Sequence, residues 1–181
     1  MKILSLPSNL KRVSQQWRRL QQVHKLCSER KWLDCISLAK ELTSAQENDF
    51  FGFYYQGICN TEFKFFDEAL SDFESALINL KKNKFPKIME EYEQETELRI
   101  AHVFRLQRKY SIALERLDKL INQYPKYAFA YKSKAGIQID MDKLQNALET
   151  ANQGLSEQPN DEGLVNLRNS LVYDLTTNRN G

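Results

Sequence analysis

Turn-forming residues are scarce in this sequence. Its 6 glycines and 4 prolines make up about 5.5% of 181 residues, against roughly 12% in average proteins. A chain this poor in both residues is typical of helices joined by short turns. The scarcity does not indicate disorder, because 41% of the residues are hydrophobic and 11% are aromatic, which is enough to bury a core.

Cysteine and long apolar runs are also nearly missing. Cys27, Cys35 and Cys59 form an odd set without the spacing of a metal or redox motif, which favours reduced thiols in the cytoplasm. No stretch approaches 18 apolar residues, and the apolar run in Met1–Leu6 is too brief for the core of a signal peptide. We therefore expect a cytoplasmic protein with no membrane span.

Excess charge is absent from the chain as a whole, whose formal net charge is +2. Such a balance gives no overall field that would attract nucleic acid, so nucleic acid is a disfavoured partner. The N-terminal part of the chain, up to Lys40, is nevertheless basic, with nine Lys and Arg against Glu29 and Asp34. This patch could meet an acidic partner, RNA or only solvent, and the sequence leaves the three open. Its members are Lys2, Lys11, Arg12, Arg18, Arg19, Lys25, Arg30, Lys31 and Lys40.

Catalytic and metal-binding motifs are not found either. The sequence contains no Gly-rich phosphate loop, nucleophile elbow, HExxH motif or EF-hand loop. His24 and Cys27 share a helical face, but two ligands do not make a tetrahedral zinc site. The glutamates between Glu90 and Glu97 spread around a helix, as a solvated face does, and do not face each other across a pocket. We expect a protein that is not an enzyme and needs no cofactor.

What is present is a repeat. Small and aromatic residues alternate at helical spacing in Phe66, Ala69, Phe73 and Ala76, and Gly57 precedes them at the distance expected across one helical hairpin. This pattern resembles the tetratricopeptide family, whose repeats of about 34 residues are helix-turn-helix units. The resemblance implies an all-α solenoid, in which small residues let two antiparallel helices approach closely.

Three further copies of the pattern can be aligned with the first. Two of them follow the first copy and lie one repeat length apart from each other. The third is a degenerate copy that lies one repeat length before the copy that contains Gly57. Asn60 and Gln138 depart from the pattern, because the family usually has a large residue there, so we expect looser packing of their helices. We assign one domain over residues 1–181, with repeats at about 16–49, 50–83, 94–127 and 128–161 and a capping helix at 162–177. The copies rest on Val23, Trp32, Cys35, Ala39 and Leu42; Ala101, Tyr110, Ala113, Leu117, Leu120 and Pro125; and Ala135, Leu144, Ala147, Ala151, Gly154 and Pro159.

The segment 84–93 is an insertion that interrupts the regular repeat spacing. Pro86 is suited to the first turn of a helix, so the segment is expected to extend the first helix of the third repeat by about two and a half turns. Such an arm, around Ile88–Tyr92, is either an inert extension or a contact for a partner or a second copy of the chain. A homodimer through this arm is therefore one candidate assembly.

The resemblance also implies where a partner would bind. In this family the first helix of each repeat lines a concave groove. The five aromatic residues between Phe50 and Tyr55 exceed what one helix normally buries, so some are expected to be exposed as a binding platform, unless all pack against neighbouring repeats. Arg99, Arg105 and Lys132 are expected to pair either with carboxylates of a bound peptide or within the chain. The groove candidates are Trp17, His24, Phe51, Tyr54, Tyr55, Ile58, Arg99, His102, Arg105, Phe129 and Lys132.

The function expected from these observations is that of a protein-interaction adaptor. It would hold a peptide or helix of another protein, with apolar and acidic residues, in its groove. Two alternatives stay open at this point: a secretion-type or assembly chaperone that holds an unfolded client, and an RNA-binding module that uses the basic N-terminal region.

Overall fold

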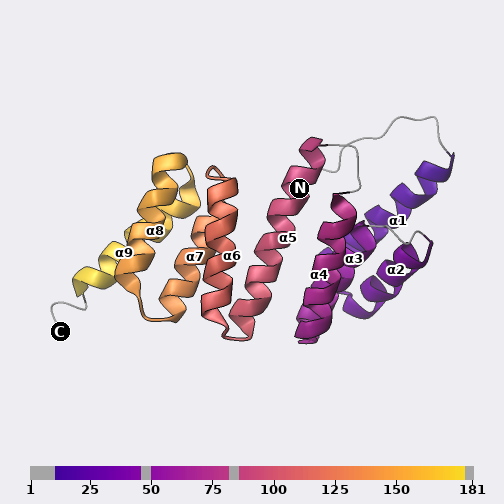
Figure 1. Ribbon diagram of the computed structural model, residues 1–181, viewed down its shortest axis with the longest axis horizontal. Coiled ribbons are helices and arrows are strands. Elements are labelled where there is room, and N and C mark those ends of the chain that lie inside the picture. The colour runs from indigo at the N-terminus through magenta and orange to yellow at the C-terminus, as the bar shows by residue number, and fades with distance from the viewer. Residues whose placement is uncertain (1–10, 46–49, 82–85, 178–181) are drawn as a thin grey trace. The chain divides into compact units, whose positions relative to one another are not determined.

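The computed structural model is all-α over the residues that it describes, which are 11–45, 50–81 and 86–177, with side chains described except at 11–17, 45 and 86–89. These residues form nine helices and no strand, which confirms the expected all-α solenoid (Figure 1). The helices are α1 (Lys11–Ser28), α2 (Trp32–Ala45), α3 (Phe50–Glu62), α4 (Phe66–Leu80), α5 (Pro86–Leu106), α6 (Tyr110–Gln123), α7 (Ala128–Asp140), α8 (Leu144–Glu157) and α9 (Glu162–Thr177).

The chain divides into two compact units. Unit 1 spans residues 1–84 and contains α1 to α4, and unit 2 spans residues 85–181 and contains α5 to α9. Within each unit, consecutive helices pack against each other, and α1 also contacts α3, α5 contacts α7, and α7 contacts α9. The assignment of one domain over residues 1–181 stays a prediction.

The turns inside the helix pairs repeat one backbone geometry. In the part of the chain that the structure describes, four non-glycine residues have a positive φ, and the two in each unit lie one repeat length apart. In each turn the amide after this residue donates to the carbonyl oxygen five residues earlier, at 2.8–2.9 Å, which closes the preceding helix as a Schellman motif. The four are Arg30 (φ 57°), Lys64 (φ 63°), Arg108 (φ 58°) and Asp142 (φ 59°).

Small residues and one ring form the core of the α3–α4 pair. Ala69, Phe73 and Ala76 on α4 are fully buried. A Cβ atom placed on Gly57 of α3 would lie only 2.7 Å from the Phe73 ring, so a glycine is needed for this close approach. Burying a Phe side chain stabilises a fold by about 1.5–3 kcal/mol, which makes Phe73 a principal contributor to unit 1.

Unit 2 uses the same kind of packing. Ala101 of α5 and the buried residues Ala113 and Leu117 of α6 belong to one apolar cluster. A second cluster joins Ala135 of α7 to Ala147 of α8, together with residues of α9. Alanine at these points lets neighbouring helices come close without a void, as the repeat spacing predicts.

Helix α5 is the longest described helix, with 21 residues, and it begins at Pro86. A proline fits the first turn because its missing N–H has no partner within the helix. In the candidate arm Ile88–Tyr92, the side chain of Ile88 lies outside the described residues, while Tyr92 is half-buried. Burial and the nearby Glu91 raise the pKa of Tyr92 to about 12. A homodimer through this arm stays a prediction.

Candidate protein-binding surface

The predicted groove residues fall into two sets, one in each unit. Unit 1 holds those of α1 and α3, and unit 2 holds those of α5 and α7. Trp17 belongs to α1, but its side chain is outside the described residues.

Most of the predicted aromatic platform of unit 1 is buried. Tyr54 and Tyr55 are only 6% and 4% exposed, and Ile58 is 8% exposed. The Tyr54 ring stacks on Phe50 at 5.6 Å and meets Phe73 edge-on at 6.1 Å. The expectation that Tyr54 and Tyr55 offer their rings to a partner is therefore not met in this structure, because helices on several sides of α3 cover them.

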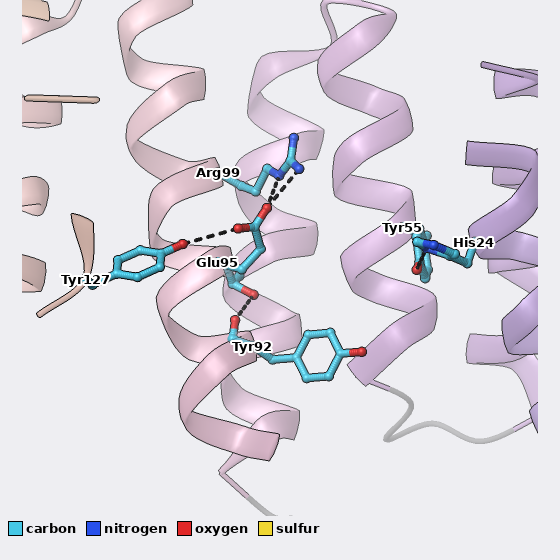
Figure 2. A network of polar contacts seen from close by, with 7 residues as sticks. His24, Tyr55, Tyr92, Glu95, Arg99 and Tyr127 are labelled. Atoms are coloured by element: carbon cyan, nitrogen blue, oxygen red, sulfur yellow. Dashed lines mark hydrogen bonds and ion pairs between the residues drawn. The ribbon is translucent and has the colours of Figure 1, made fainter. Parts of the chain in front are cut away.

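Phe51 and His24 keep part of their surface in unit 1. Both side chains are half-buried. The His24 ring lies 6.3 Å from the Tyr55 ring, and its Nδ1 is 2.9 Å from the Tyr55 hydroxyl oxygen (Figure 2). This hydrogen bond ties α1 to α3 and fixes the orientation of the histidine.

The predicted groove cations of unit 2 are paired within the chain. The Arg99 guanidinium lies 2.8 Å from Glu95 Oε1, and the same carboxylate accepts a hydrogen bond from the Tyr127 hydroxyl at 3.3 Å (Figure 2). Because both donors share one carboxylate, Glu95 links α5 to the start of α7. Burial, together with the charge of Glu95 and the bond to it, raises the pKa of Tyr127.

The other two predicted cations also have carboxylate partners. Arg105 binds Asp140 through two hydrogen bonds, at 2.6 and 2.9 Å, and this guanidinium lowers the pKa of Asp140. Lys132 lies 3.2 Å from Asp161 Oδ1. Arg99, Arg105 and Lys132 are expected to pair either with a bound peptide or within the chain, and in the structure they pair within the chain. They therefore do not form an open cationic end of a groove.

Unit 2 exposes the ring of Phe129 on α7 as well as that of Tyr173 on α9, which is 67% exposed. Phe129, on the first turn of α7, is 57% exposed. The ammonium of Lys132 lies 4.2 Å from the centre of its ring, which is a cation–π distance, and Tyr127 packs beside it at 5.7 Å. His102 of α5 is also exposed. The face thus combines an exposed apolar ring with ordered charged groups.

The carboxylates that organise this surface were not among the sequence candidates. Asp140 and Arg105 are separated by close to one repeat length, so equivalent positions of neighbouring repeats meet across the helices. Asp161 Oδ1 also accepts a hydrogen bond from the backbone amide of Leu164 at 2.8 Å. The carboxylate therefore caps the start of α9. Looking for opposite charges about one repeat apart would have found the first pair.

The thiols of unit 1 lie together. A hydrogen bond with Cys27 lowers the pKa of Cys35, but a hydrogen bond with Cys59 and burial raise it more, to about 12. The Cys35 thiol also lies 3.7 Å from the Val23 carbonyl oxygen. Among residues whose side chains are described, no three His, Cys, Asp or Glu are placed to hold a metal ion.

Among the described helices, none is both long enough and apolar enough to cross a bilayer.

Comparison with known proteins identifies the fold. No family model and no curated protein matches the sequence. The crystal structure of the APC/C hetero-tetramer Cut9–Hcn1 contains a chain similar in structure, with a TM-score of 0.69 and 15% identity over 86% of this chain, which spans only 30% of that chain. A MamA crystal structure matches with a TM-score of 0.60 and 13% identity over 89% of this chain and 88% of its own. The MamA RS-1 ArsTM double mutant matches with a TM-score of 0.61 and 15% identity over 91% and 96%. These neighbours are tetratricopeptide-repeat proteins, and this chain therefore has the fold of the tetratricopeptide family that its repeat spacing predicts.

Proposed function

We propose that this chain is a non-enzymatic adaptor that binds a peptide or helix of another protein on the α5–α7 face of unit 2. The observation that carries the proposal is Phe129, a large ring that is 57% exposed although it sits on a well-packed helix. Exposed aromatic rings in ordered surroundings are typical anchors of protein interfaces.

The neighbours of Phe129 prepare it for binding. Lys132 and Tyr127 both contact the ring, so less side-chain freedom is left to lose when a partner covers it. A ring with two torsions already costs little entropy to order. The partner group that suits this ring is an apolar side chain.

The paired charges around the ring define the rest of the partner. The ion pairs Arg99–Glu95 and Lys132–Asp161 are partly exposed, so an acidic residue of the partner would share the cation of an existing pair. Such rim charges set orientation and association rate more than affinity. We therefore assign most of the binding free energy to the apolar contact.

The comparisons agree with this mode of action. The chain similar to this one in the Cut9–Hcn1 structure is part of a hetero-tetramer, so that protein assembles with others. RNA binding gains less support, because Lys25 and Lys31 of the basic patch both pair with Glu29.

The test replaces the ring and a matched control. Phe129→Ala removes the proposed anchor, and Ile112→Ala removes a side chain of α6 that is 41% exposed in the same unit. Tagged variants are used to capture proteins from lysate of the source cells, and the captured proteins are quantified by mass spectrometry. We expect Phe129→Ala to weaken capture of the true partner on the order of 10- to 30-fold, as loss of about 2 kcal/mol does.

A cross-link locates the contact. Photoreactive benzoylphenylalanine at position 129 should form an adduct with the same partner, and the analogue at position 112 should not. If both alanine variants capture the same proteins equally, or if position 129 yields no adduct, the proposed face is wrong.

A further inference from the structure

Unit 1 has a hollow on another part of its surface. It has a volume of about 710 Å³ and lies among α2, α3 and α4. None of the predicted groove residues lines it. Its lining residues are Ile36, Lys40, Gln56, Asn60, Phe63, Phe65, Asp67, Glu68, Ser71 and Asp72.

A small side chain at position 60 explains the space. The repeat spacing places Asn60 in register with Leu26, one repeat earlier, and with Phe104, one repeat later once the insertion 84–93 is allowed for. Both counterparts are larger and apolar, so Asn60 leaves room that they would fill. Its side-chain amide donates a hydrogen bond to Asp72 Oδ2 at 2.7 Å and so holds that carboxylate at the wall of the hollow.

The hollow is acidic although the N-terminal part of the chain is basic. Three carboxylates line it, those of Asp67, Glu68 and Asp72, against one cation, Lys40. Asp67 and Glu68 lie in the first turn of α4, where they also stabilise the helix dipole. Asp72 is different, because it lies further along the helix and is partly desolvated. Burial raises the pKa of Asp72 to about 6, against the lowering effect of the Asn60 hydrogen bond and of Lys40, and with a further rise from Glu68.

Two rings complete the site. Phe65 is 55% exposed, and its ring centre lies 6.1 Å from that of Phe63. An aromatic face beside a carboxylate is the combination that binds a guanidinium group well, because the planar cation stacks on the ring and donates two hydrogen bonds to the carboxylate.

The chain itself shows an arginine in the corresponding place of unit 2. Arg116 occupies the same repeat register as Asp72, one repeat later and beyond the insertion. Its guanidinium carbon is 5.9 Å from the centre of the Phe104 ring, and its Nη1 is 3.0 Å from Glu97. In unit 1 the register of Arg116 has Asp72 and the register of Phe104 has Asn60, so both the cation and the ring of this arrangement are replaced. The corresponding part of unit 1 is left with a carboxylate and no arginine, and the ring that an incoming guanidinium group would stack on is Phe65, which also lines the hollow.

We propose that the hollow among α2, α3 and α4 binds an arginine side chain of a partner protein, with its guanidinium on Asp72 and against Phe65. The volume of the hollow accommodates the side chain together with flanking residues of its chain. This site is separate from Phe129, so it can fail while the proposed adaptor face holds, and the reverse is also true.

The test uses short synthetic peptides and the full chain. An acetylated, amidated Gly-Leu-Arg-Leu-Gly peptide is titrated into ¹⁵N-labelled protein, and the NMR signals of Gly57, Asn60 and Phe65 are followed. A peptide with citrulline in place of arginine has the same shape without the charge. We expect the arginine peptide to shift these signals and the citrulline peptide to bind about tenfold more weakly, since a charge-assisted hydrogen bond is lost.

Three variants locate the contact. Asp72→Asn keeps the shape of the carboxylate and should weaken the arginine peptide about tenfold, and Phe65→Ala should weaken it severalfold without affecting the fold, because the ring is exposed. Glu41→Gln removes the same charge from an exposed site on α2 that does not line the hollow, and it should have no effect.

The pH dependence gives a further check. Binding of the arginine peptide should weaken as the pH falls through about 6, where Asp72 becomes protonated, and Asp72→Asn should lose most of this dependence. The proposal is overturned if the two peptides bind alike, if Asp72→Asn and Glu41→Gln behave alike, or if the shifts fall only on the Phe129 face. It is equally overturned if the hollow is found to hold a second copy of the chain.

Discussion

Replacing Gly57 by alanine tests the closest approach in the fold. Alanine favours a helix over glycine by about 1 kcal/mol, which alone would stabilise α3. The new Cβ atom, however, would lie 2.7 Å from two carbons of the buried Phe73 ring and 2.9 Å from a third, so the ring or the helix must move. Overpacking of this kind costs about 1–3 kcal/mol, and we expect a net destabilisation of up to about 2 kcal/mol.

A second substitution separates the clash from other effects. Phe73→Leu alone should destabilise unit 1, by less than the roughly 3–5 kcal/mol that is typical of Phe→Ala, because most of the space stays filled. In combination with Gly57→Ala, the smaller side chain should relieve the clash. The double variant should therefore be more stable than the sum of the two single effects, by about 1–2 kcal/mol.

The assay is urea denaturation followed by tryptophan fluorescence, since Trp17 and Trp32 both belong to unit 1. The urea concentration at the midpoint of unfolding is compared between variants whose dependence of unfolding free energy on urea concentration is the same. Gly136→Ala serves as the control, followed by circular dichroism: its nearest new contact is Arg105 Nη1 at 3.2 Å, so the guanidinium needs to shift by only a few tenths of an ångström, whereas at Gly57 a buried ring is in the way. Gly136→Ala should therefore change the free energy of unfolding by no more than about 1 kcal/mol. Additivity of Gly57→Ala and Phe73→Leu within about 0.5 kcal/mol would refute the packing argument.

Three smaller predictions follow from the polar contacts. The lowered pKa of Asp140 means that its pair with Arg105 stabilises the fold above about pH 4 and that this contribution is lost as the pH falls through the folded pKa. Asp140→Asn should therefore lower the free energy of unfolding by no more than about 1 kcal/mol at pH 7, and the difference from the unmodified chain should shrink as the pH is lowered below the ordinary aspartate range, as measured by urea denaturation at both ends of this range. Cys35 is fully buried and has a pKa of about 12, so it should react with iodoacetamide at pH 7.5 only after denaturation. Peptide mapping by mass spectrometry shows which cysteine is labelled, and labelling of Cys35 in the native protein would contradict this prediction. Asp161→Ala removes the cap on the Leu164 amide and should destabilise unit 2 by about 1 kcal/mol in thermal unfolding, whereas an unchanged midpoint would mean that the cap contributes nothing.

The fold could be predicted because its determinants are local and periodic. The interval from Gly57 to Ala69 and Phe73 reflects a contact between two helices joined by a short turn, and such contacts leave a regular trace in the sequence. The lengths of α3 and α7 follow from the same register. The spacing therefore predicts the helix pairs with no knowledge of what covers them.

The exposure of individual side chains could not be predicted in this way. Tyr54 and Tyr55 occupy positions that resemble a groove, but their burial depends on all the helices packed around α3, and α1 and α2 among these come from the preceding repeat. The same holds for Arg105, whose partner Asp140 lies one repeat further along the chain. The looser packing expected at Asn60 agrees with the hollow beside Asp72, but the three carboxylates that line the hollow come from α4 and belong to no motif of the repeat.

The left-handed turn residues leave room for engineering. Arg and Lys adopt a positive φ at a cost of about 1 kcal/mol or more, whereas asparagine and aspartate enter this region more readily and glycine without steric penalty. Changing Arg30, Lys64 and Arg108 to asparagine should raise the melting temperature in small, additive steps, because the sites are far apart in the sequence and belong to separate turns. A stabilised variant of this kind would stay folded when destabilising substitutions are made at other positions. Loss of binding could then be measured separately from loss of folding.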